Sequence, residues 1–183
     1  MARPGGSAGT GAAEEAAGVA WPPRHRTIRS YPKSNRYLEA GQYWAVPLSD
    51  GRFACGRVLD VPREPDLHVP VSRVLFLAGM LDWVGRTPPT SRAIAGAGLL
   101  AQGFAHVKAI TTTGAAVLGR RDLEADGIVA APWRSHEGGG TVWVYEGARR
   151  VRPATAADRD LPVMGTWGYS VIKVLAERAF ATR

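Results

Sequence analysis

The feature that most constrains the fold of this chain is a pair of apolar runs separated by a turn signal. The runs cover residues 41–48 and 52–59, and Ser49-Asp50-Gly51 lies between them. Side chains in both runs alternate with a period of two, which is typical of β-strands. An Asp-Gly pair supplies the positive φ angles of a two-residue hairpin turn, so we predict such a turn here. Gly56, inside the second run, predicts a bulge or a bend where the sheet curls.

The same stretch resembles the start of the bacterial immunity protein 26 family, in which a strand ending in Pro-Leu enters an Asp-Gly turn and leaves through Arg-aromatic-x-x-Gly-Arg-Val. A looser similarity extends over about residues 37–182. The resemblance implies an immunity protein that neutralises a cognate toxin of a bacterial polymorphic-toxin system by stoichiometric binding. The family label also carries an association with a phosphotriesterase. The matching positions are Gly41, Pro47, Leu48, Asp50, Gly51, Arg52, Phe53, Gly56, Arg57 and Val58.

Length and composition predict one domain preceded by a tail. The 183 residues suit a single compact domain, which we place at residues 37–182. Residues 1–30 consist largely of small residues, proline and scattered charge, so we expect a disordered tail. The sequence contains neither a secretory signal nor an apolar run of the about 18 residues that a membrane span needs. Its one cysteine, Cys55, suits a reducing compartment and a buried strand position. We therefore expect a cytoplasmic protein.

Further apolar runs predict a mostly β fold of the α+β class. We expect six or seven strands in a curled antiparallel sheet or a small, partly open barrel, with one C-terminal helix. In that helix, from Gly168 onward, apolar side chains recur at the spacing of one helical face. Residues 93–100 contain too many glycines for a stable helix and predict either a short helix or an irregular lid. Beyond the hairpin, the expected strands cover residues 71–83, 104–113, 117–118, 127–132, 141–145 and 149–152.

The net charge of +7 raises the alternative of a nucleic-acid-binding β-barrel module. Residues 1–36 contribute six Arg or Lys and two Glu, a net +4, and the rest of the chain contributes +3. A flexible basic tail contacts phosphates without reading sequence. We therefore expect at most weak, nonspecific nucleic-acid contact through the tail.

A second alternative is a metal-dependent phosphotriester hydrolase. Such a site needs clustered histidines and carboxylates. The histidines, however, are isolated in sequence, and no Gly-x-Ser-x-Gly or phosphate-binding Gly-Lys-Ser/Thr motif is present. We therefore predict a non-enzymatic protein without a metal or a cofactor. The four histidines are His25, His68, His106 and His136.

Partner-binding residues are expected around the glycine-rich segment 138–140. The chain has six tryptophans, most of which we expect in the core. Trp133, next to Pro132 and Arg134 and just before the glycine loop, is the one most expected at the surface, where a Trp-Arg pair has the composition of a binding hot spot. The alternative for Trp133 is a packed loop anchor. His136 and Arg52 are further candidates. Arg57 is expected either to pair with a buried carboxylate such as Asp82 or Asp122, which would be a structural role, or to face a partner.

Overall fold

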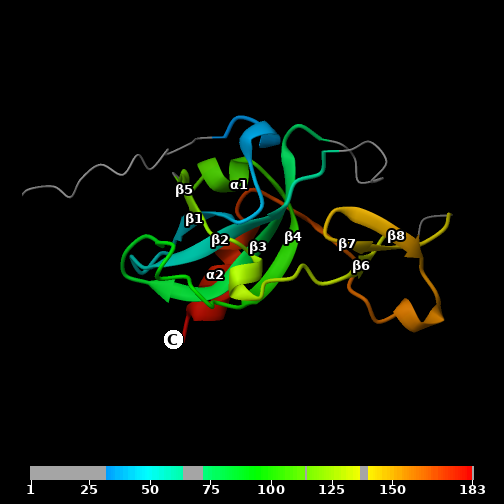
Figure 1. Cartoon of the computed structure of the whole chain (residues 1–183). Helices are drawn as coiled ribbons and strands as arrows, with labels where there is room; N and C mark the ends of the chain where they lie inside the picture. Colours follow the sequence, from blue (N-terminus) through cyan, green and yellow to red (C-terminus); the bar gives the residue numbers. More distant parts are fainter. Residues whose placement is uncertain (1–31, 64–71, 114, 137–139, 183) are drawn as a thin grey trace, which may run out of the picture.

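The computed structural model describes residues 32–63, 72–113, 115–136 and 140–182. These residues form a mostly β structure of the α+β class, as the sequence predicts. They contain nine strands in two sheets, and neither sheet closes into a barrel (Figure 1). The expected tail, residues 1–30, lies outside the described residues. No helix in the described ranges has the length and apolar character needed to cross a membrane.

The larger sheet has six strands in the order β5-β1-β2-β3-β4-β9. Neighbouring strands of this sheet run antiparallel, except that β9 runs parallel to β4. The smaller sheet has three antiparallel strands in the order β6-β7-β8. The strands are β1 (Gln42–Pro47), β2 (Phe53–Asp60), β3 (Leu75–Gly85), β4 (Leu99–His106), β5 (Val117–Arg120), β6 (Trp133–Arg134), β7 (Trp143–Glu146), β8 (Arg149–Pro153) and β9 (Thr166–Trp167).

The predicted hairpin joins β1 to β2, but its loop has three residues instead of two. The amide of Gly51 donates to the carbonyl of Leu48 at 3.2 Å, and the amide of Leu48 donates to the carbonyl of Arg52 at 2.9 Å. Gly51 has a φ of +84°, as predicted. A β-turn followed by a left-handed glycine is the usual form of a three-residue hairpin loop. The Asp-Gly signal therefore identified the turn and its left-handed residue but not the loop length.

Gly56 lies where the β2–β3 pairing is irregular, which confirms the predicted bulge. Ala54 pairs with Val84 and Gly56 with Met80, so β3 contains extra residues at this point. A Cβ atom on Gly56 would lie only 2.2 Å from the indole ring of Trp44. The missing side chain thus makes room for the ring, which is fully buried.

Two of the expected strands between residues 93 and 132 differ from the structure. The strand predicted over 104–113 is β4, which begins earlier at Leu99 and ends at His106; it is followed by a one-turn helix, α1 (Lys108–Thr111). The imidazole Nδ1 of His106 accepts from the amide of Lys108 at 2.9 Å, which turns the chain into this helix. The strand predicted over 127–132 is a loop after the 3₁₀ turn η3 (Glu124–Asp126). Of the two alternatives for 93–100, the structure has the irregular one: residues 91–96 form turns, and β4 begins at Leu99.

Both faces of the six-stranded sheet are covered, so β1 and β2 are buried on both sides. The C-terminal helix α2 (Val171–Phe180), which the sequence predicts, packs across one face through Ile172, Ala176 and Phe180. On the other face, Cys55 packs in a cluster that includes residues of the smaller sheet. Burial raises the pKa of the Cys55 thiol. The carboxylate of Asp60 also links the sheets by accepting from the amide of Ala148 at 2.9 Å.

Candidate functional site

The hairpin loop holds the end of α2, which gives Arg52 a structural role. The Asp50 carboxylate accepts from the Arg52 amide at 2.9 Å and from its Nε at 2.6 Å, and these two hydrogen bonds lower the pKa of Asp50. Nη2 of Arg52 donates to the carbonyl of Phe180 at 2.8 Å. A cation at this position stabilises the carbonyl end of a helix. Ser49 adds contacts to Glu177 through its amide, at 2.7 Å, and its hydroxyl, at 3.1 Å.

Arg57 is also structural, but its partner differs from the predicted ones. Its Nη1 lies 2.8 Å from Oδ2 of Asp126, and both side chains are fully buried. Its Nη2 donates to the backbone carbonyls of Arg121 and Asp122 at 2.5 and 3.1 Å. The expected pairing with a buried carboxylate is therefore confirmed, but the two carboxylates named for it, Asp82 and Asp122, are wrong. The η3 turn, which the sequence did not predict, brings Asp126 to this position.

Trp133 is buried, which corrects its prediction as a surface residue. Only 6% of it is exposed. Its ring stacks on Tyr145 at 4.1 Å between centroids and meets Phe104 edge-on at 5.8 Å. Its Nε1 donates to the carbonyl of Gly147 at 2.8 Å. The pairing of β6 with β7 turns the Trp133 ring toward the larger sheet, where it joins a buried cluster.

The other predicted partner contacts do not form one surface with Arg52. Arg134 is half-buried, and its Nε donates to the carbonyl of Leu161 at 3.2 Å. His136 is exposed, and residues 137–139 lie outside the described ranges. The loop between β1 and β2, which carries Arg52, lies at the opposite side of the molecule from β6 (Figure 1).

A surface Trp-Arg pair does exist, but it joins Trp143 to Arg150 on neighbouring strands. The guanidinium carbon of Arg150 lies 3.9 Å from the ring centroid of Trp143, and both residues are half-buried. Arg150 is directly opposite Tyr145, so it reaches Trp143 along the diagonal of the sheet. This contact is a cation–π interaction. We call Trp143, Arg149, Arg150, Val151 and Arg152 the β8 surface.

The β8 surface has a defined shape, because its outer residues are held by carboxylates. Arg152 donates to both oxygens of Asp158 at 2.6 and 2.7 Å. Asp158 ends the short turn η4 (Ala156–Asp158) and also accepts from the amide and hydroxyl of Thr155. The hydrogen bonds from Arg152, and after them those from Thr155, lower the pKa of Asp158. Arg149 lies 3.9 Å from Glu146. Val151 is the extra residue of a β-bulge and is 42% exposed.

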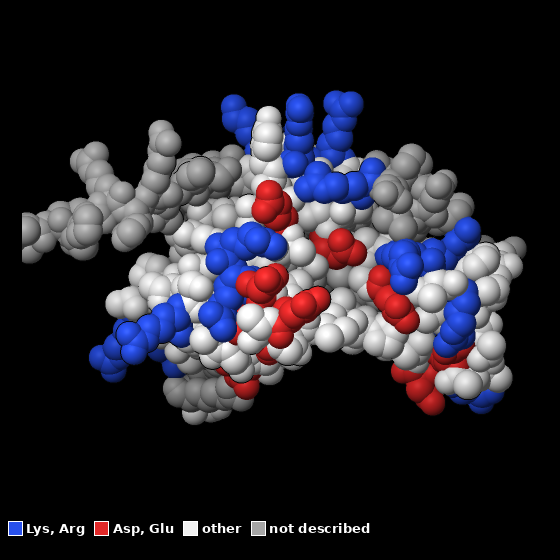
Figure 2. All heavy atoms as spheres, viewed as in Figure 1, with Lys and Arg blue, Asp and Glu red and all other residues white. Residues whose placement is uncertain are grey.

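Basic side chains are visible in several regions of the molecule in Figure 2, and two of these regions bear on the site. Figure 2 shows Lys and Arg side chains projecting above the 3₁₀ turn η1 (Asn35–Tyr37) and others over the three-stranded sheet. Acidic side chains accompany the basic ones over the three-stranded sheet, which agrees with the ion pairs of Arg149 and Arg152.

A metal site would require a cluster of ligands. Within the described ranges, no group of three or more His, Cys, Asp or Glu side chains is placed to hold a metal ion. His106, the histidine on β4, packs edge-on against Tyr169 at 5.0 Å between centroids. Burial and the nearby Lys108 lower the pKa of His106.

Comparison with known proteins gives no match to a family model, a curated protein or a solved structure. The functional argument therefore depends on the geometry of this chain, and the similarity to immunity protein 26 stays a prediction.

Proposed function

We propose that this protein is a non-enzymatic, cytoplasmic immunity protein that neutralises a cognate bacterial toxin by stoichiometric binding through the β8 surface. The resemblance of the hairpin region suggests the class of protein. The observation that supports the surface is the Trp143–Arg150 pair on an exposed edge strand. Tryptophan and arginine are the residues most enriched at binding hot spots.

The β8 surface is suited to binding because its side chains are ordered before a partner arrives. Stacking fixes the Arg150 guanidinium over the indole, and Asp158 fixes Arg152. Ordering a long side chain in advance reduces the entropy lost on association. β8 is also the last strand of its sheet, an arrangement that allows a partner strand to add to the edge.

The charge of Arg150 suggests an acidic contact on the partner. Arg149 and Arg152 have carboxylate neighbours, whereas Arg150 makes no ion pair with any described carboxylate. A partner carboxylate at the outer edge of this guanidinium would form a charge-assisted hydrogen bond with it. The mildly basic chain does not suit phosphate mimicry, so the toxin is either not a nuclease or is not blocked in that way.

The test is co-expression with a toxin domain encoded beside this gene. We expect the intact protein to restore growth and to form a complex of fixed stoichiometry in calorimetry. Arg150→Ala and Trp143→Ala should each weaken the complex by about 2 kcal/mol or more, the range of hot-spot residues. Arg92→Ala, which removes the same charge from another exposed position, is the matched control and should bind normally.

Two results would contradict this proposal. A complex unaffected by Arg150→Ala and Trp143→Ala would exclude the β8 surface. One equivalent of bound zinc in protein purified without an affinity tag, together with triester hydrolysis lost on chelation, would support the phosphotriester hydrolase instead.

A further inference from the structure

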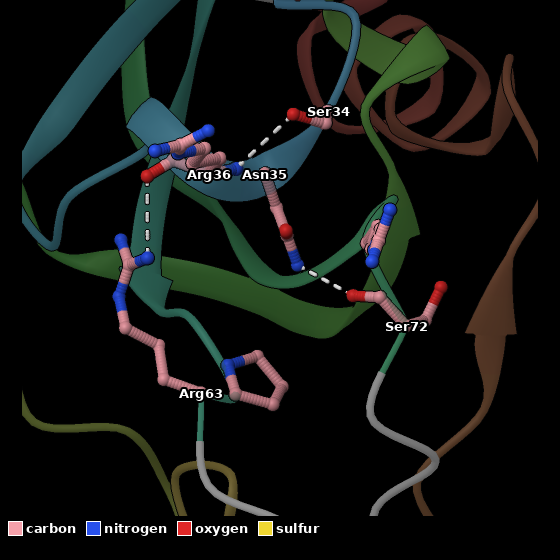
Figure 3. A pocket seen from close by; sticks show the side chains of 7 residues that line it. Ser34, Asn35, Arg36, Arg63 and Ser72 are labelled. Carbon is pink, nitrogen blue, oxygen red and sulfur yellow. Dashed lines mark hydrogen bonds between the residues drawn. The ribbon is translucent and has the colours of Figure 1, made fainter.

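A cavity of about 690 Å³ lies beside η1, where the chain enters the six-stranded sheet. Its walls come from η1, from the residues after β2 and from those before β3, and Figure 3 shows the side chains that line it. We call it the η1 pocket. The lining residues are Ser34, Asn35, Arg36, Pro62, Arg63, Ser72 and Arg73.

The walls of the η1 pocket are fixed to one another by hydrogen bonds. The side chain of Asn35 is buried and donates through Nδ2 to the carbonyls of Ser72 and Leu75 at 2.7 and 2.6 Å. On the other side, Arg63 donates to the carbonyls of Arg36 and Leu38 at 3.2 and 2.5 Å. Figure 3 shows Arg63 and Ser72 on opposite sides of the Asn35 amide. The pocket is therefore preorganised.

The η1 pocket carries three positive charges. Arg36, Arg63 and Arg73 are exposed, and none of them forms an ion pair with a carboxylate of the described residues. A guanidinium presents donors in a planar fork that matches a phosphate group.

Two hydroxyl groups add donors to the η1 pocket. Oγ of Ser34 accepts from the amide of Arg36 at 3.4 Å, and Oγ of Ser72 accepts from the amide of Val74 at 3.3 Å. Because each oxygen accepts from the backbone, its own proton can be donated to a ligand.

An exposed aromatic ring lies next to these charges. Tyr37, the last residue of η1, is 71% exposed. The guanidinium carbon of Arg36 lies 5.5 Å from the centroid of its ring, so Arg36 connects the ring with the pocket. An open aromatic face beside a basic groove is the combination that proteins use to stack a base and hold its phosphate.

We infer that the η1 pocket binds a nucleotide unit, with its phosphate held by Arg36, Arg63 and Arg73 and its base stacked on Tyr37. The unit belongs either to a free nucleotide or to a single-stranded nucleic acid. This activity goes beyond toxin binding and uses none of the residues of the β8 surface.

The test is fluorescence anisotropy of labelled ten-residue oligo(dT) and oligo(U). The full chain is used, so that the acidic residues Glu64 and Asp66, which follow Arg63, are present in the assay. We expect Tyr37→Ala to weaken oligonucleotide binding about tenfold, the effect of losing one stacked base. Arg73→Ala should weaken binding and lower the slope of log affinity against log salt by about 0.7, the value for one single-strand phosphate contact. Tyr37 and Arg73 are exposed, so circular dichroism should show both variants folded.

Controls separate the pocket from general basic charge. Arg92→Ala should bind as the parent does, and so should Trp143→Ala, which is designed to disable the β8 surface only. If AMP displaces the labelled oligonucleotide, the ligand is a free nucleotide. If AMP does not displace it, the ligand is a single strand, and either result supports the inference. It is overturned if no binding occurs at low salt, if Arg73→Ala and Arg92→Ala behave alike, or if only loss of the tail arginines Arg24 and Arg26 weakens binding. Inorganic phosphate that competes as well as AMP, with Tyr37→Ala neutral, overturns it too.

Discussion

Arg57 and Asp126 form a fully buried ion pair that joins strand β2 to the η3 turn across 69 residues of sequence. The carboxylate also accepts from Nε of Arg121 at 2.7 Å and from the amide of Gly96 at 2.9 Å. A buried charge is tolerated when its hydrogen-bonding capacity is filled in this way. The ion pair thus fixes strand β2, the η3 turn and the turn at Gly96 together.

Removing the Asp126 carboxylate should destabilise the fold strongly. Asp126→Ala leaves the Arg57 guanidinium buried without a counter-ion, a change that lowers the free energy of unfolding by about 3–5 kcal/mol. Urea denaturation followed by circular dichroism measures it. Asp122→Ala is the matched control, because the Asp122 side chain is 72% exposed. Equal stability of the two variants would contradict the structural role of the pair.

The same carboxylate should make stability depend on pH in the acid range. Burial alone would raise the pKa of Asp126, but hydrogen bonds from Gly96, Arg121 and Arg57 outweigh it and lower the pKa from 3.8 to about 2. A group with a lowered folded-state pKa stabilises the protein above its unfolded pKa and loses that effect as the pH falls. The free energy of unfolding should therefore fall between pH 4 and pH 2, and Asp126→Asn should reduce that slope.

Gly51→Val should destabilise the protein through its backbone alone. Gly51 has a φ of +84°, and a Cβ atom there would meet nothing within 4 Å. The expected loss is about 1–3 kcal/mol in the free energy of unfolding, because β-branched residues are strained at positive φ. Gly98→Val is the control, since its site is equally open and has no positive φ. An unchanged melting temperature for Gly51→Val would show that the turn does not depend on glycine.

Trp133→Ala should lower the stability of the fold and should not act through the loss of a partner contact. The indole is buried between Tyr145 and Phe104, and truncation of such a ring lowers stability by about 3–5 kcal/mol. Trp143→Ala, at a half-buried position on the neighbouring strand, should cost much less. Thermal melts of both variants test the contrast, and a stable Trp133→Ala would return that residue to the list of surface candidates.

Deletion of residues 1–30 should change the free energy of unfolding by no more than about 1 kcal/mol. The composition of this segment provides few apolar anchors apart from Val19-Ala-Trp21. Denaturation of the shortened chain measures the difference. A larger loss would show that Trp21 packs against the domain, and Trp21→Ala in the full chain would then reproduce it.

Local signals predicted the fold class and several of its elements. The β1–β2 hairpin, its left-handed Gly51, the bulge at Gly56 and helix α2 were each encoded within a few consecutive residues. The predictions for 104–113 and 127–132 were less accurate. In both segments alternating or β-branched residues resembled strands. The chain turns instead at the hydrogen bond from the Lys108 amide to the His106 imidazole and at the left-handed Gly127.

The candidate site was less predictable, because it depends on which segments meet. The Trp-Arg composition pointed to neighbours in sequence, Trp133 and Arg134, while the surface pair is Trp143 and Arg150 on facing strands. Trp143 and Arg150 lie within the strands predicted over 141–145 and 149–152. The bulge at Val151, which sets the final register, is not visible in the local pattern.

The sequence by itself determined where the first hairpin turns, that most of the apolar runs form strands and which face of the last helix is apolar, because these properties depend on the spacing of neighbouring residues. The tertiary structure decided that Trp133 is buried, that Asp126 is the partner of Arg57 and that Arg36, Arg63 and Arg73 surround one cavity. Each of these outcomes joins segments far apart along the chain. Periodicity shows that a side chain will be covered, whereas only the packing of the two sheets and their loops determines which side chain covers it.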